Sequence, residues 1–186
     1  MTCIINKGIA FDCSDIPQAG IEAQGIVINY ADYRAAKLAG SITVDANGEI
    51  TALTLPSTKQ GWAFQVPKGS NIVATEPLRQ IDGIDGYDHT VQLRVATIEK
   101  LDLDEISKMR FNKVVIIVTM SEGRSKVYGG NVGMRLSEYD SNIGDANTGA
   151  TVAFTAQTDS REAPESQIPD LIASAFDLDT LLTPAV

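Results

Sequence analysis

The chain has few of the residues on which enzymes and metal sites depend. Its 186 residues include two cysteines, one histidine and 6% aromatic residues. Two cysteines cannot complete a tetrahedral zinc site, and His89 lies far from both of them in the sequence. Nucleophilic catalysis usually requires a histidine as base. We interpret His89 as a surface or hairpin residue, and we expect no catalytic residue, no metal ligand and no cofactor.

Motifs of common enzyme families are also missing. The sequence contains neither the phosphate-binding G-x-x-x-x-G-K-[ST] motif nor the G-x-S-x-G nucleophile elbow. The glycine-rich run Gly129–Gly133 falls inside a predicted strand, so we interpret it as a bulge or a site of close backbone packing. The scarcity of aromatic residues argues against a glycosidase cleft. The sequence therefore predicts a protein that is not an enzyme.

Positive charge and long apolar runs are scarce as well. Lys and Arg number 15 against 24 Asp and Glu, which gives a net charge of −9. Affinity for nucleic acid comes from Lys and Arg, so we expect no nucleic-acid ligand, although nucleic acid could slide past such a surface. The longest apolar run, Val114–Val118, is far shorter than the ~20 residues that span a bilayer. We expect no membrane segment and no secretory signal. The two cysteines are therefore expected to be free thiols, with a Cys3–Cys13 disulfide as the alternative.

Alternation of apolar and polar residues is the main pattern that is present. It predicts half-buried strands at Thr90–Val95 and Thr151–Gln157. The β-branched run Lys113–Met120 predicts a strand that is buried on both faces. Weaker alternation predicts further strands at 25–30, 41–44, 50–55 and 130–136.

Turn residues connect these strands. Asn47-Gly48 predicts a tight hairpin. Asp82–Gly86 and Ser121–Ser125 each separate two strand-like runs, and they predict two longer antiparallel hairpins. Loops are expected at 56–61, 67–71 and 137–149, where prolines or small polar residues gather.

One segment has helical periodicity. A helix is predicted from Asp102 or Asp104 to Asn112, with Leu103, Ile106 and Met109 on its apolar face. A weaker helix is expected at Asp170–Phe176. The predicted fold is a β-rich α+β domain, a small β-sandwich or barrel with one flanking helix and long hairpins. This domain spans residues 1–158, and residues 159–186 are interpreted as a polar C-terminal arm that needs a partner to become ordered.

Two features suggest ligand or partner binding. Acidic side chains cluster in two loops, but neither cluster fits the EF-hand register, so Asp-Gly turns are the favoured interpretation. The first cluster is Asp82, Asp85 and Asp88, and the second consists of Asp140 and Asp145 with the amide Asn142. Trp62 and Phe64 alternate with polar or small residues near Pro56 and Pro67. They form either an exposed loop between subunits or part of the domain's own core.

Several segments together resemble a known family. The opening Cys3–Cys13 is similar to the start of virion structural proteins from phages of Bacteroidetes, including crAss-like phages. The order of segments in the middle of the chain also resembles these proteins, as does the end of the domain. The segments in question are His89–Ile98, Leu103–Ile106, Val114–Val118, Tyr128–Met134, Gly149–Gln157 and Glu162-Ala163-Pro164. The sequence departs from the family at Asp15–Gly20 and in the extension Ile168–Val186.

The resemblance implies a tail-tube-like or neck-ring subunit. Such a protein would form closed rings of six or twelve copies, would contact adjacent ring, portal or tail proteins, and would let genomic DNA pass without binding it. It would be assembled in the bacterial cytoplasm and would end up in the virion. Its hairpins would line the channel or join subunits; the candidate residues are Asp82, Asp85, Asp88, Glu122, Arg124 and Lys126, with Trp62 and Phe64 as a candidate inter-subunit loop. A calcium- or glycan-binding β-sandwich fibre or adhesin domain is the alternative.

Overall fold

The fold is known from a computed structural model that describes residues 21–67, 72–81, 84–95, 100–119, 124–145, 149–159, 164–166 and 169–183. The strands are β1 (Ile21–Asn29), β2 (Ile42–Val44), β3 (Ile50–Leu53), β4 (Trp62–Pro67), β5 (Val73–Thr75), β6 (Leu78–Ile81), β7 (Ile84–Tyr87), β8 (Thr90–Val95), β9 (Val114–Thr119), β10 (Ser125–Tyr128), β11 (Met134–Asp145), β12 (Gly149–Thr158) and β13 (Asp170–Ile172). The helices are α1 (Tyr30–Leu38), α2 (Lys100–Lys108) and the 3-10 helix η1 (Leu178–Leu182).

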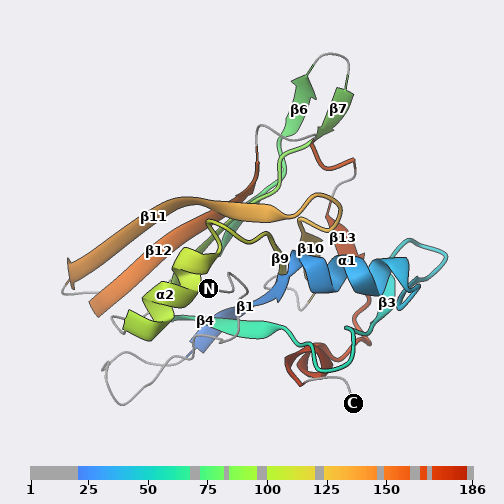
Figure 1. The fold of residues 1–186 in the computed structure, drawn as a ribbon, viewed down its shortest axis with the longest axis horizontal. Helices are drawn as coiled ribbons and strands as arrows, with labels where there is room; N and C mark the ends of the chain where they lie inside the picture. Colours follow the sequence, from blue (N-terminus) through green and yellow to red (C-terminus); the bar gives the residue numbers. More distant parts are fainter. Residues whose placement is uncertain are drawn as a thin grey trace.

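The predicted β-rich α+β class is confirmed, although no closed barrel forms among the described strands. Eleven strands belong to one mixed sheet (Figure 1). One half contains β1 between β4 and β9, followed by β10, β13, β3 and β2. The other half contains β11, β12, β8 and β5. A single residue pair, Met134 with Val114, links the two halves.

The two halves of the sheet face each other across a first hydrophobic core. Phe64 on β4 and Phe154 on β12 meet edge to face, with 5.8 Å between the ring centroids. Both rings are fully buried. Alternate residues of β1 and β9, such as Val27 and Ile116, point into this same core. The arrangement is therefore a sandwich in which β1 and β9 form the centre of one layer.

A second hydrophobic core lies on the opposite face of β1 and β9. Ile28 on β1 and Ile117 on β9 contribute to it, and α1 covers it with Tyr33 and Ala36. Every residue of β9 from Val114 to Val118 is buried. The prediction that this strand is buried on both faces is thus confirmed, and it explains why its sequence is a continuous apolar run rather than an alternating one.

Helix α1 was not predicted, and the interpretation of a single flanking helix was wrong. The segment contains strong helix formers, with alanines at 31, 35 and 36. It ends at Gly40, whose φ of +70° suits glycine. The backbone N–H of Ser41 donates to the carbonyl of Ala36, which closes the helix end. Only Tyr33 and Ala36 on α1 are buried, so the sequence contains too few apolar residues at helical spacing to predict a helix here.

Three loop and strand assignments differ from the prediction. Gly129–Gly133 is a turn between β10 and β11, in which Gly129 and Gly133 both have φ of +79°. The expected loop at 137–149 is largely strand, because β11 continues to Asp145 and pairs with β12. The hairpin predicted with a loop at Asp82–Gly86 is tighter than expected: Ile81 pairs with Ile84, so Ile84–Gly86 already belong to strand β7. The hairpins at Asn47-Gly48 and between β9 and β10 are confirmed.

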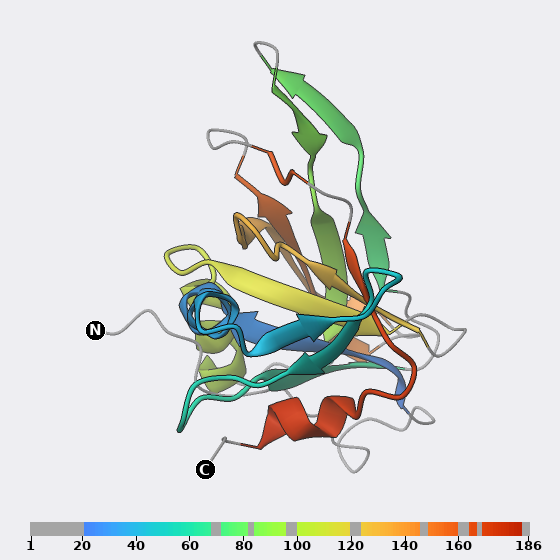
Figure 2. The ribbon, with the colours of Figure 1, turned by 90° about the vertical axis from the view of Figure 1, so that its right-hand side faces the viewer.

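The described part of the C-terminal segment is not a polar arm. Asp170–Ile172 is strand β13 rather than a helix, and it pairs with β10. Ile172 and Leu181 are buried in the second core. Figure 2 shows this segment, in red, passing across the body of the molecule and ending in η1 beside β4. In the sequence, these two apolar residues are surrounded by polar ones, which is why composition alone predicted a disordered arm.

In the part of the chain that is described, neither helix has the length and apolarity needed to cross a membrane.

Truncation after Asp159 tests the role of the C-terminal segment. The truncated chain loses Ile172 and Leu181 from the second core, and burial of each such side chain contributes about 1.5–3 kcal/mol. We expect a loss of several kcal/mol in the free energy of unfolding, measured by urea denaturation. A chain ending at Thr183 is the control and should keep the stability of the full chain. Equal stability of the chain ending at Asp159 would show that this segment is dispensable for folding.

Candidate assembly surfaces

The β6–β7 hairpin is the element that stands furthest from the body of the molecule. It is a separate two-stranded sheet, and both views show it projecting beyond the other strands (Figures 1 and 2). Leu78 is 59% exposed, and Asp85 is exposed as well. The predicted site residue Asp82 lies outside the described residues.

The base of this hairpin is fixed to the body. Arg79 Nε lies 2.9 Å from a carboxylate oxygen of Asp88, and both side chains are largely buried. Tyr87 exchanges two backbone hydrogen bonds with Glu165, at 2.8 and 3.0 Å. Gly86 packs so closely against Pro164 and Glu165 that a Cβ there would come within 2.6 Å of both residues. The C-terminal segment therefore fixes the orientation of the hairpin relative to the body of the molecule.

The candidate residues of the β9–β10 hairpin are engaged within the chain. Arg124 forms an ion pair with Glu49. Lys126 forms an ion pair with Glu76 at 3.0 Å, and Glu76 also accepts a hydrogen bond from the Tyr128 hydroxyl. Glu122 lies outside the described residues. These pairs join β10 to the segments that carry Glu49 and Glu76, so Arg124 and Lys126 help to hold the fold.

The candidate loop at Trp62 and Phe64 is strand β4. Its register with β1 pairs Gly25 with Phe64 and Val27 with Trp62. Phe64 is fully buried in the first core, and Trp62 is partly buried against it. Of the two interpretations left open by the sequence, the core position is the correct one for Phe64, and Phe64 is not an inter-subunit residue.

A buried polar centre, which the sequence did not indicate, surrounds the turn 129–133. The fully buried Glu165 carboxylate accepts hydrogen bonds from the backbone N–H groups of Asn131 and Val132, at 3.0 and 2.8 Å. The backbone N–H of Gly129 donates to His89 Nδ1 at 3.0 Å. His89 is buried rather than exposed, so its predicted surface position was wrong. Glu165 and His89, which come from opposite sides of this turn in the sequence, thus satisfy its backbone.

Two further titratable groups lie near this centre. Burial raises the pKa of the Tyr33 hydroxyl, and the charges of Asp170 and Glu165 raise it further. Burial also raises the pKa of the Asp170 carboxyl, while the nearby Lys37 and His89 act in the opposite direction. Of these acidic side chains, Glu165 satisfies backbone N–H groups of the turn. No group of three or more potential metal ligands occurs among the residues that the structure describes.

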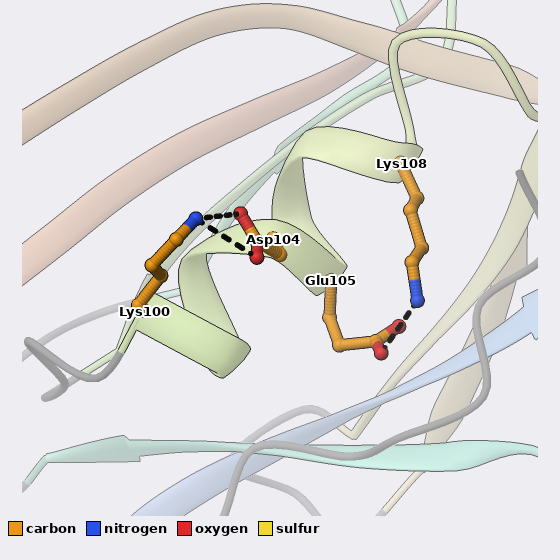
Figure 3. Close-up of polar contacts among 4 residues, drawn as sticks. All are labelled: Lys100, Asp104, Glu105 and Lys108. Atoms are coloured by element: carbon orange, nitrogen blue, oxygen red, sulfur yellow. Dashed lines mark hydrogen bonds and ion pairs between the residues drawn. The ribbon is translucent and has the colours of Figure 1, made fainter. Parts of the chain in front are cut away.

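A groove runs between α2 and β11. Leu103, Leu136 and Tyr139 provide its apolar surface, and its volume is about 530 Å³. Tyr139 is 46% exposed. On the rest of α2, charged side chains neutralise each other along the helix: Lys100 contacts Asp104 at 3.2 Å, and Lys108 contacts Glu105 at 2.7 Å (Figure 3). The predicted helix is confirmed, and its Asp102 lies inside α2 rather than at the start.

A second, smaller hollow adjoins this groove. Its lining includes Arg110 and Arg135 together with Gln157 and Asp159, and its volume is about 320 Å³. Arg110 belongs to both hollows. Phe111, whose ring lies 5.6 Å from the Arg110 guanidinium, is 66% exposed. The α2–β11 face thus combines exposed apolar side chains with arginine side chains.

Comparisons with protein-family models, with curated proteins and with solved structures find no match to this chain.

Replacing Glu165 by alanine tests the buried polar centre. The substitution leaves two backbone N–H groups without their acceptor, and a buried group of this kind costs about 1–3 kcal/mol. We expect a loss of that size in the free energy of unfolding, measured by urea denaturation. Ser166→Ala, at an exposed neighbouring position, should change it by less than ~0.5 kcal/mol. Equal stability of both variants would contradict a structural role for the carboxylate.

Replacing Asp170 by asparagine tests the electrostatic cost of its burial. Since the folded protein raises the pKa of Asp170, its ionised form is penalised at pH 7 and the penalty disappears as the pH falls through that pKa. We expect Asp170→Asn to stabilise the protein at pH 7, and the gain to shrink toward pH 4.

The exposed Asp140→Asn variant is the matched control and should change the free energy of unfolding at pH 7 by less than ~0.5 kcal/mol. Denaturation curves at a series of pH values give the comparison. A gain from Asp170→Asn that grows on acidification would contradict the assigned direction.

Proposed function

We propose that the protein is a structural subunit of a bacteriophage tail tube or neck ring. Copies of the chain assemble into a closed ring that lines a channel for genome passage. The single observation that carries this proposal is the β6–β7 hairpin, which stands clear of the body on a base fixed by Arg79, Asp88 and Glu165. A rigid element that presents exposed apolar surface to solvent is suited to contact another protein.

The open edges of the sheet support the same function. Strands β2 and β5 are the two ends of the main strand order. Val44 on β2 and Val73 on β5 are exposed, at 59% and 48%. Unpaired edge strands offer backbone groups to a strand from another chain. An assembly subunit uses such edges, whereas a monomer normally protects them.

The charge and the sequence resemblance complete the argument. A net charge of −9 repels the phosphate backbone of DNA, so DNA can move through a channel built from such copies without being held. The segments Cys3–Cys13 and Gly149–Gln157 resemble those of phage virion proteins. Residues 1–20 lie outside the described structure, so the first of these segments supports the proposal by sequence alone.

Measurement of the mass distribution tests this function directly. The purified chain, examined by mass photometry over a range of concentrations, should form a closed oligomer of defined size, and electron microscopy should show rings or stacked rings with a central opening. Because like charges repel in an acidic chain, assembly should strengthen as salt is raised toward about 0.15 M and beyond. A chain that stays monomeric at every concentration, also together with neighbouring virion proteins, would refute the proposal.

A further inference from the structure

We propose that His89 is a pH-sensitive switch: the folded protein holds its imidazole ring neutral, and protonation of the ring in mild acid releases the turn 129–133 and loosens the base of the β6–β7 hairpin. His89 is the only histidine of the sequence, and histidine is the side chain whose charge ordinarily changes between about pH 5 and 8. The inference goes beyond the proposed function, because the switch belongs to a single chain and does not require a ring.

The hydrogen bond at Nδ1 defines the protonation state of the ring. The backbone N–H of Gly129 donates to His89 Nδ1 at 3.0 Å, so this nitrogen must present its lone pair. The neutral ring with its hydrogen on Nε2 meets that requirement, whereas the imidazolium ion has a hydrogen on both nitrogens. Protonation therefore places two donors, Nδ1–H and the Gly129 N–H, against each other, and the hydrogen bond is lost.

The surroundings of the ring leave it little room to adjust. His89 is 2% exposed, and its ring meets the Tyr128 ring edge to face, with 5.6 Å between the centroids. The main chain of His89 is also fixed, because its N–H donates to the Thr158 hydroxyl and its carbonyl accepts from the Thr158 N–H. A positive charge at this depth has little water around it, and such burial disfavours the charged form of a histidine.

The carboxylate of Asp170, on β13, acts in the opposite direction but loses its effect in acid. Asp170 and His89 interact electrostatically, so the negative charge of Asp170 favours a positive ring. Lys37 on α1 interacts with the same carboxylate. Burial raises the pKa of the Asp170 carboxyl, so Asp170 becomes neutral at a higher pH than an ordinary aspartate. The group that could compensate a charged His89 therefore fades as the pH is lowered.

The other titratable groups around the ring supply no compensating charge. Burial, with Glu76 beside it, raises the pKa of the Tyr128 hydroxyl above its ordinary value, so this group stays uncharged in acid. Asp88, next to His89 in the sequence, lies 2.9 Å from Arg79 Nε and already faces a positive charge. The Glu165 carboxylate accepts hydrogen bonds from backbone N–H groups of the turn. Burial and the bond at Nδ1 thus outweigh the attraction that remains.

The loss of one hydrogen bond reaches the hairpin through Glu165. The turn 129–133 is held from two sides, since His89 accepts from Gly129 and Glu165 accepts from two further backbone N–H groups. Glu165 also exchanges two backbone hydrogen bonds with Tyr87 at the base of the hairpin. A turn that moves away from the protonated ring takes its N–H groups away from Glu165, so the support of the hairpin weakens in the same event.

The direction of the pH dependence follows from the neutral ring. The unfolded chain takes up a proton on His89 near pH ~6.5, the ordinary value for histidine. The folded chain does not, so below this pH the unfolded state binds more protons and stability falls as the pH is lowered. Asp170 contributes with the opposite sign, because its raised pKa makes the folded state bind more protons in acid. The two contributions can therefore be separated by experiment.

Nuclear magnetic resonance of the full chain tests the protonation state directly. Because His89 is the only histidine, its ¹⁵N-labelled ring gives one set of signals, which distinguish the two neutral tautomers from the imidazolium ion. We expect a neutral ring with its hydrogen on Nε2 at about pH 7.5, and a ring still neutral in the folded protein at about pH 6, where most free histidine is protonated. A folded protein with a protonated ring at about pH 7, or with its hydrogen on Nδ1, overturns the inference.

The variant His89→Asn removes the titration but keeps the acceptor, because the asparagine side-chain oxygen can take the place of Nδ1. Urea denaturation between about pH 7.5 and 5.5 compares it with the unaltered chain. Below pH ~6.5 the folding equilibrium constant of the unaltered chain should fall, relative to that of the variant, by up to about tenfold per pH unit, or about 1.4 kcal/mol. An equal pH dependence of the two chains shows that His89 is not the switch.

The matched control is Arg34→His in the His89→Asn background, which restores one histidine at an exposed position on α1. An exposed ring titrates alike in the folded and unfolded chains, so the control should keep the pH dependence of His89→Asn. If the control instead regains the pH dependence of the unaltered chain, burial of His89 is not its cause.

Hydrogen–deuterium exchange of the unaltered chain locates the opening and requires no variant to fold. After correction for the intrinsic exchange rates, peptides that contain the turn 129–133 and Tyr87 should lose protection between about pH 7.5 and 5.5, by up to about tenfold per pH unit. Peptides of the central strand β9 should keep theirs. An equal loss of protection in all peptides, or none at the turn, contradicts the release of the turn.

Discussion

Burial of β1 and β9 on both faces is the constraint on which the rest of the fold depends. Ile26–Ile28 of β1 and Val114–Val118 of β9 are apolar on both faces, so neither face of these stretches can lie in water and a second layer must cover each side. The half-sheet with β8 and β12 covers one side, where Phe154 of β12 packs against Phe64 of β4. Helix α1 and the C-terminal segment cover the other. Both covering layers are built from short or separate segments of the sequence. The two central strands nevertheless require both layers, because both of their faces are apolar.

The buried polar centre at the turn 129–133 connects the layers that pack on the two faces of β1 and β9. Glu165 binds the backbone of the turn and pairs with Tyr87 at the base of the hairpin, while His89 receives the N–H of Gly129. A single segment of the C-terminal region therefore fixes the turn, the hairpin and the second core together. The element proposed for assembly is positioned by residues that also determine stability, which couples the two properties.

Sequence patterns predicted the strands well and the long-range contacts poorly. Alternation at Thr90–Val95 and the apolar run at 113–120 reflect burial directly, so both strands could be identified. The buried positions of His89 and Glu165 could not, because each is satisfied by backbone groups far away in the sequence. Gly129–Gly133 was placed in a strand since a sequence does not reveal which glycines adopt positive φ. Of the site residues, Phe64 was assigned to a possible interface although its alternation with Val66 equally fits a core strand.

The pairing of β13 has a consequence for the order of events during synthesis. The second core begins with residues of β1 and is completed by Ile172 and Leu181, more than a hundred residues later in the chain. While translation is still under way, this face of the central strands is covered by α1 alone and exposes part of its apolar surface. Contacts this distant form slowly, and incompletely covered sheets are prone to aggregate. Because Glu165 belongs to the same late segment, the backbone hydrogen bonds that fix the base of the projecting hairpin also form only after this segment has been synthesised.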